Sequence, residues 1–99
     1  MNKAELSDII AEGLGLTKVE TLAVVDAFIV IVKDTLGKGE RVEMRGFGTF
    51  GLKNRKAKIG RNPKTGVVVP IPPRMMPHFK PSPEFRKLIE EKLGSGNKE

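Results

Sequence analysis

The sequence predicts an α+β fold, in which helices at both ends flank a small antiparallel sheet that extends into a β-ribbon arm. Apolar residues recur at helical spacing near both ends, the middle alternates like strands, and four prolines lie within residues 70–77. With 99 residues, 38% of them apolar, the chain is near the size at which one core is marginal. We therefore expect a single domain over residues 1–93 that forms a dimer, and a disordered tail over residues 94–99.

Two helices are predicted at the N-terminal end. Residues 3–14 place apolar side chains three and four positions apart, and Asn2 stands three residues before Glu5, which is the spacing of a capping box. A second capping box opens a longer helix over residues 18–36, and Gly37 ends it.

The middle of the second helix, LAVVDAFIVIV at residues 22–32, is apolar on nearly every side. Such a helix has to be covered all round. A second copy of the chain would cover it, and burial inside a monomer is the alternative. The stretch has 11 residues and includes Asp26. It is therefore far short of the ~20 apolar residues that span a bilayer, and no membrane partner is expected.

Three strands are predicted in the middle of the chain. Residues 40–45 alternate, GFG at residues 46–48 interrupts the pattern, and residues 49–59 resume it. We interpret the two glycines as positions of tight backbone packing beside phenylalanines. The third strand, residues 67–79, contains four prolines. Proline cannot donate to a strand ladder, so this strand belongs at an edge.

Because a free two-stranded ribbon tolerates edge prolines, we expect residues 53–74 to project as an arm with GRNPKTG, residues 60–66, at its tip. After the ribbon, Ser82 is a predicted N-cap, and a proline follows it at the first helical position. A short C-terminal helix should then run to about Leu93.

Charge is distributed unevenly along the chain. Of 18 basic and 12 acidic residues, nine basic and no acidic ones lie between residues 44 and 83, so this part carries +9 and the remainder −3. A region of 40 residues without a carboxylate is typical of a surface that binds a polyanion. A solvated basic face without a partner is the alternative.

Other motifs point away from catalysis. There is no cysteine, which excludes disulfides and thiolate sites. GRNPKTG differs from a phosphate-binding loop because Lys64 and Thr65 precede the second glycine. His78 is the only histidine, with no catalytic pattern around it. We predict no enzyme activity, cofactor, metal or small-molecule substrate. PIPPR, residues 70–74, has a Pro-x-x-Pro spacing and leaves a protein-interaction module as an alternative function.

GFGTF at residues 46–50, GRNPKTG at 60–66 and PHFKP at 77–81 resemble the signature of the bacterial HU and integration host factor family. The resemblance covers residues 1–93. It implies an intertwined dimer that organises the nucleoid in the cytoplasm and bends double-stranded DNA, with two arms in the minor groove. The dimer could pair two copies or two related chains.

The resemblance also implies roles for single residues. Pro63 would be the apolar wedge that intercalates between base pairs, while Arg61, Asn62 and Lys64 would hold groove edges and phosphates. The alternative is that Pro63 only stiffens the turn.

GERVEMRGFGTF, residues 39–50, is similar to the beta chains of integration host factor, in which an arginine at the position of Arg45 reaches the minor groove beside an acidic residue, here Glu43. This similarity implies site preference, and HU-like non-specific compaction is the alternative. Pro83 departs from the family, because many relatives have a DNA-contacting lysine there.

The predicted DNA-binding residues are Lys3, Arg45, Lys53, Arg55, Lys56, Lys58, Arg61, Asn62, Pro63, Lys64, Arg74 and Lys80. The predicted dimer core consists of Phe28, Phe47, Phe50 and Phe79.

Overall fold

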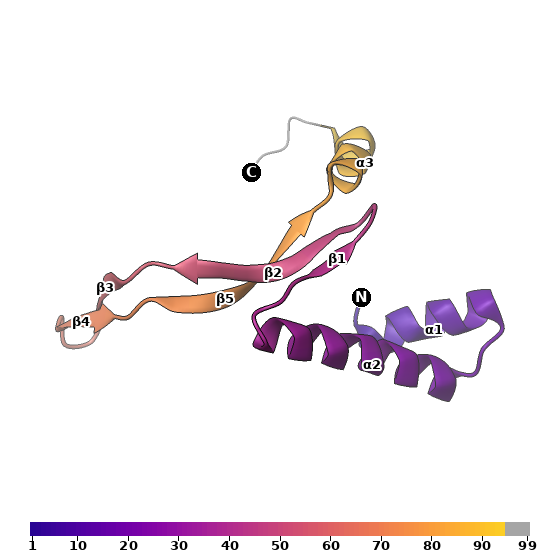
Figure 1. Cartoon of the computed structure of the whole chain (residues 1–99), viewed down its shortest axis with the longest axis horizontal. Helices are drawn as coiled ribbons and strands as arrows, with labels where there is room; N and C mark the ends of the chain where they lie inside the picture. The colour runs from indigo at the N-terminus through magenta and orange to yellow at the C-terminus, as the bar shows by residue number, and fades with distance from the viewer. Residues whose placement is uncertain (95–99) are drawn as a thin grey trace. The chain divides into compact units, whose positions relative to one another are not determined.

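The computed structural model describes residues 1–94, which form three helices and five strands (Figure 1). The predicted α+β fold class is confirmed. The chain divides into two compact units, Met1–Lys38 and a second unit that begins at Gly39. The single domain and the tail therefore stay predictions, and residues 95–99 lie outside the described part. None of the described helices is long and apolar enough to cross a membrane.

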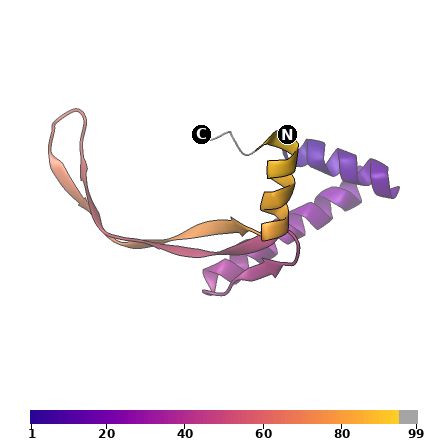
Figure 2. The ribbon, with the colours of Figure 1, turned by 90° about the horizontal axis from the view of Figure 1, so that it is seen from above.

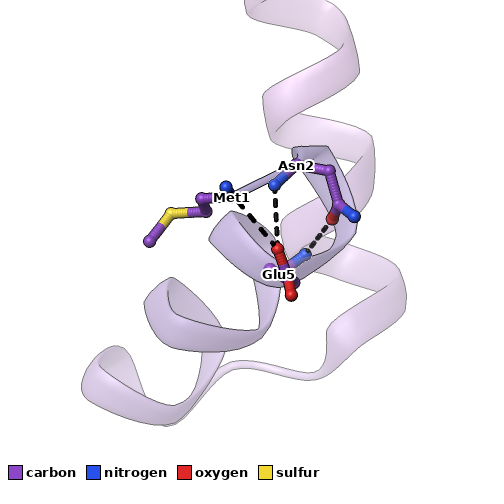
Figure 3. Close-up of polar contacts among 3 residues, drawn as sticks. All are labelled: Met1, Asn2 and Glu5. Atoms are coloured by element: carbon purple, nitrogen blue, oxygen red, sulfur yellow. Dashed lines mark hydrogen bonds and ion pairs between the residues drawn. The ribbon is translucent and has the colours of Figure 1, made fainter.

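The first unit consists of α1 (Lys3–Leu14) and α2 (Lys18–Gly37). Figure 3 shows the predicted capping box of α1, in which the Glu5 N–H donates to Asn2 Oδ1 over 2.8 Å and the Asn2 N–H donates to Glu5 Oε1 over 3.0 Å. The charged N-terminus of Met1 lies 3.9 Å from the same Glu5 oxygen.

Thr17 and Glu20 form the same reciprocal pair at the start of α2. The backbone N–H of Thr17, and after it the Thr17 side chain, hold the pKa of Glu20 below its usual value. These hydrogen bonds favour the charged carboxylate, so the stabilisation they bring to the start of α2 is lost as the pH falls through that lowered pKa.

The first unit buries few of its apolar side chains. The buried residues of α1 and α2 are small ones: Ser7, Ala11 and Thr21. Along α2, Val24 remains 64% exposed and Ile31 remains 61% exposed. One chain therefore does not cover the apolar run that the sequence places in this helix, and this exposed surface is available to a partner.

The second unit contains a three-stranded antiparallel sheet in the order β1 (Val42–Met44), β2 (Gly48–Arg55), β5 (Arg74–Pro81). A separate two-stranded sheet pairs β3 (Lys58–Arg61) with β4 (Val68–Ile71). The C-terminal α3 (Pro83–Leu93) begins after Ser82, whose Oγ accepts the Phe85 N–H as expected of an N-cap.

The two long predicted strands are each broken in the structure. The ladder between β2 and β5 ends at the pair Arg55–Arg74, and the ladder between β3 and β4 starts at Lys58–Ile71. Residues 56–57 therefore lie across from the two prolines 72–73. Because proline has no N–H, the ladder cannot continue there. Figure 2 shows the ribbon changing direction beyond β2 and β5.

Four phenylalanines form an aromatic cluster in the second unit, with ring centroids 4.9–6.4 Å apart: Phe47, Phe50, Phe79 and Phe85. The two glycines of GFG make this cluster possible. Gly46 has φ 81° in the turn that the Phe47 N–H closes on the Met44 carbonyl. A Cβ on Gly48 would lie 2.5 Å from both Phe79 Cζ and the Lys80 carbonyl oxygen.

We expect Gly48→Ala to lower the free energy of unfolding by about 1–3 kcal/mol, because the added methyl overlaps the Phe79 ring and the backbone of the next strand. Gly13→Ala is the control, since a Cβ there meets nothing within 4 Å. In the interior of α1, alanine should raise stability by up to about 1 kcal/mol. Thermal or denaturant unfolding measures both, and equal stability of Gly48→Ala and wild type would contradict the packing argument.

Candidate nucleic-acid interface

The pairing of β2 with β5 sorts side chains by chemistry. Successive residues of a strand point to opposite faces, and directly paired residues share a face. The register pairs Thr49 with Lys80, Lys53 with Met76 and Arg55 with Arg74. One face, which we call the basic face, therefore carries four predicted DNA-binding cations: Lys53, Arg55, Arg74 and Lys80. The opposite face carries Phe50, Leu52, Met75 and Phe79.

The cations of the basic face have no ion-pair partner within residues 1–94. Arg55 and Arg74 stand directly opposite each other, an arrangement that is unfavourable for like charges. Among the described residues, the ion pairs involve only the first unit, and none reaches the basic face. Arg74 Nε instead donates to the thioether sulfur of Met76 over 3.3 Å. An external anion between the two arginines would relieve their repulsion.

The tip of the arm is a closed turn. The Asn62 N–H donates to the Val67 carbonyl over 2.9 Å, and the Gly66 N–H donates to the Asn62 carbonyl over 2.7 Å. The Lys64 N–H donates to Asn62 Oδ1 over 2.9 Å, spanning the proline between them. Gly66 completes the turn at φ 74°. Pro63 is thus held exposed at the end of the ribbon.

Asn62 has a structural role in the turn, because its side-chain oxygen accepts the Lys64 N–H. Its contact with a groove edge stays a prediction.

The other predicted cations of the arm lie in β3 or next to it. Arg61 lies at the end of β3 opposite Val68, and Lys56 lies in the break between β2 and β3; both are exposed. Lys58 belongs to β3, but its side chain lies outside the described part.

Two predicted residues belong to helices of the first unit. Lys3 belongs to α1, and its Nζ is 2.7 Å from Asp26 Oδ1, so its charge is already paired at the surface. Phe28 belongs to α2, and the other three predicted core phenylalanines, Phe47, Phe50 and Phe79, belong to the aromatic cluster.

Arg45 is exposed in the turn between β1 and β2. Together with Lys80 it lines an open hollow of about 780 Å³ in the second unit. Arg41 lines the same hollow, although the sequence analysis missed it. The sequence did contain a signal for it. Arg41 stands two residues before Glu43 and four residues before Arg45, and an alternating strand puts these three residues on one side.

The Pro-x-x-Pro segment is not presented as a free polyproline helix. Pro70 pairs with Ile59 inside the ladder of β3 and β4. A groove that binds proline-rich ligands recognises the extended, unpaired polyproline conformation. The structure therefore gives the protein-interaction alternative no support.

A ribbon with a basic face and an exposed proline at its tip defines a protein that binds nucleic acid through strands. The family described as "Bacterial DNA-binding protein" matches residues 1–90, and the chain belongs to this family. The family consists of architectural DNA-binding proteins rather than enzymes.

Relatives of known name fall in the same group. The chain is 38% identical over 93 residues to integration host factor subunit alpha of Ralstonia nicotianae, covering 94% of this chain and 89% of that protein. It is 49% identical over 63 residues to integration host factor subunit beta of Burkholderia cenocepacia. That match covers 64% of this chain and 59% of the beta subunit, so it spans about three fifths of that relative's length.

Solved structures agree with this assignment. A cocrystal structure of Anabaena HU with DNA matches with a TM-score of 0.86 at 38% identity, covering 90% of this chain and 97% of that one. HU from Thermotoga maritima matches with a TM-score of 0.63 at 26% identity, covering 90% and 98%.

We expect Arg55→Ala to reduce the salt dependence of DNA binding. If Arg55 neutralises one phosphate, the log–log slope of affinity against salt should become shallower by about one unit. Filter binding or fluorescence anisotropy over a salt series measures the slope. Lys92→Ala, in the last turn of α3, is the control and should leave the slope unchanged. A slope that Arg55→Ala does not alter would remove this residue from the interface.

Proposed function

We propose that the chain bends double-stranded DNA as a dimer, with the arm in the minor groove and Pro63 inserted between base pairs. The observation that carries this proposal is an exposed proline at the tip of a ribbon whose base, the pair β2 and β5, carries its cations on one face. Its place of action would be the nucleoid, in the cytoplasm.

The dimer is supported by the apolar surface that one chain leaves exposed. Along α2 this surface includes Val24, Ile29 and Ile31, and on α3 it includes Leu88 and Ile89. Burying such area removes it from water at a gain of roughly 25 cal/mol per Å². The named relatives are alpha and beta subunits, so the partner is either a second copy or a related chain.

Ile29→Asp tests the dimer. In a monomer this side chain is 36% exposed, and a carboxylate there would remain partly solvated. In a dimer it would be buried without a partner, which strongly destabilises the assembly. We expect sedimentation to show dissociated or unfolded protein. Lys33→Asp, at an exposed position of the same helix, should stay dimeric. A folded wild-type monomer at micromolar concentration would overturn the dimer.

Pro63 suits a wedge because its ring is apolar, its φ is fixed and it loses little side-chain entropy on ordering. The turn that Asn62 and Gly66 close around it adds rigidity. Unstacking a base step costs on the order of a few kcal/mol, which wider contact with the bent duplex offsets.

Pro63→Ala should bind DNA but bend it less, because every cation is retained while the wedge is removed. Pro63→Leu should retain more bending than Pro63→Ala, since leucine is also apolar, although it has rotamer entropy to lose. Energy transfer between the ends of a labelled duplex, measured at saturation, compares the three proteins.

A nicked duplex is the internal control for this experiment. Base stacking is already weakened at the nick, so less free energy is needed to insert the wedge there. Wild type should therefore prefer nicked over intact DNA more strongly than Pro63→Ala does. Equal bending by wild type and Pro63→Ala would reduce Pro63 to a turn former.

Site preference is a second candidate property, favoured by the exposed position of Arg45 in the turn between β1 and β2. An arginine in the minor groove discriminates A·T from G·C pairs and responds to groove width. Without such a preference the protein would compact DNA non-specifically. Sequencing the duplexes retained from a randomised pool separates the two properties.

A further inference from the structure

The sheet of the second unit brings Arg41, Gly51 and His78 into one row. The register of β2 with β5 pairs Gly51 directly with His78. On the other side of β2, the last ladder pair is Val42 with Phe50, so the next step places Arg41 across from Gly51. A Cβ on Gly51 would lie 3.9 Å from the Arg41 Cβ, which confirms this neighbourhood.

Gly51 leaves a notch in the basic face between two side chains that can bind anions. Apart from Arg41 Cβ, nothing lies within 4 Å of the position that a Cβ on Gly51 would occupy. Arg41 and His78 are both exposed, and all three residues line the same open hollow. Neither side chain forms a hydrogen bond or ion pair with a residue in the described part of the chain.

The charged groups next to the notch along β2 and β5 are basic. Along the strands that carry it, Lys53 follows Gly51 on the same face of β2, and Lys80 follows His78 on the same face of β5. The other charged residues that line the hollow are Glu40, Glu43, Arg45 and Glu84. The nearest charges along β2 and β5 are therefore cationic. The hollow as a whole is lined by three permanent cations, Arg41, Arg45 and Lys80, and by three carboxylates, Glu40, Glu43 and Glu84.

We propose that a backbone phosphate of bound DNA occupies the notch over Gly51, held by the Arg41 guanidinium on one side and the His78 imidazole on the other. This inference rests on the proposed DNA-binding function and assigns two further contact residues to it. A charged donor strengthens a hydrogen bond to phosphate, and imidazole carries charge only when protonated. DNA binding therefore takes up a proton at His78.

The sign of the pH dependence follows from this proton uptake. Histidine is the side chain whose charge ordinarily changes between pH 5 and pH 8. Bound phosphate favours the protonated form, so affinity is higher on the acidic side and declines as the pH rises. His78 is the only histidine of the chain, which makes the effect assignable.

The test measures the dissociation constant of a duplex at pH 6.0 and pH 8.0 and at constant ionic strength, for wild type and His78→Gln. We expect wild type to bind several-fold to about tenfold more tightly at the lower pH. His78→Gln should lose most of that gain. Every other titratable group is common to both proteins.

Gly51→Val tests whether the open space over Gly51 is needed, independently of the charged side chains beside it. It keeps every charged group, favours a strand conformation and fills the space over the backbone. We expect it to lose the pH-dependent gain as His78→Gln does, while thermal unfolding verifies that it folds. Lys92→Gln, outside the hollow, is the matched charge control and should keep the full gain.

An equal gain at low pH in wild type and His78→Gln would overturn the phosphate notch, and so would a full gain in a folded Gly51→Val. Salt-sensitive binding by wild type at pH 8.0 tests the DNA-binding proposal separately. If salt-sensitive binding is absent, the DNA-binding proposal is overturned. If it is present but wild type and His78→Gln show the same pH dependence, only the phosphate notch is overturned.

Discussion

The antiparallel pairing of β2 with β5 is the constraint on which the rest of the second unit depends. Because side chains alternate along each strand, one register simultaneously gathers the cations on one face and directs Phe50 and Phe79 to the other. A slip of one residue would place arginines against the aromatic cluster. Gly48 keeps that register closely packed, since only a residue without a Cβ fits beside the Phe79 ring.

Local signals explain why much of the fold was predictable. Capping boxes and glycine positions act over three or four residues, so the bounds of α1 and α2 followed closely from the sequence. Tight packing was predicted for both glycines of GFG and is confirmed at Gly48. It is wrong at Gly46, where a Cβ would meet nothing within 4 Å and the φ of 81° serves the turn. The break between the two sheets did not follow from such local signals. The prolines indicated an edge strand, but only the cross-strand register shows that residues 72–73 lie opposite residues 56–57 and interrupt both strands.

The candidate interface was predictable as a set of charges but not as a surface. A count along the chain identified Lys53, Arg55, Arg74 and Lys80, and the register then placed them on one face. The same count omitted Arg41, because acidic residues flank it in sequence. Its neighbours in space are Gly51 and, across it, His78. Arg41 was omitted because its place beside Gly51 depends on pairing between strands, which a local sequence pattern does not encode.

The interruption at residues 56–57 and 72–73 has a mechanical consequence. A bent duplex is an elastic body that pushes back on whatever holds it bent. A continuous ladder would carry this load from the tip into β2 and β5, and from there to the aromatic cluster. Where no ladder hydrogen bonds join the strands, the tip can change its angle without breaking any. One arm can thereby follow duplexes of different curvature while the body of the second unit stays intact.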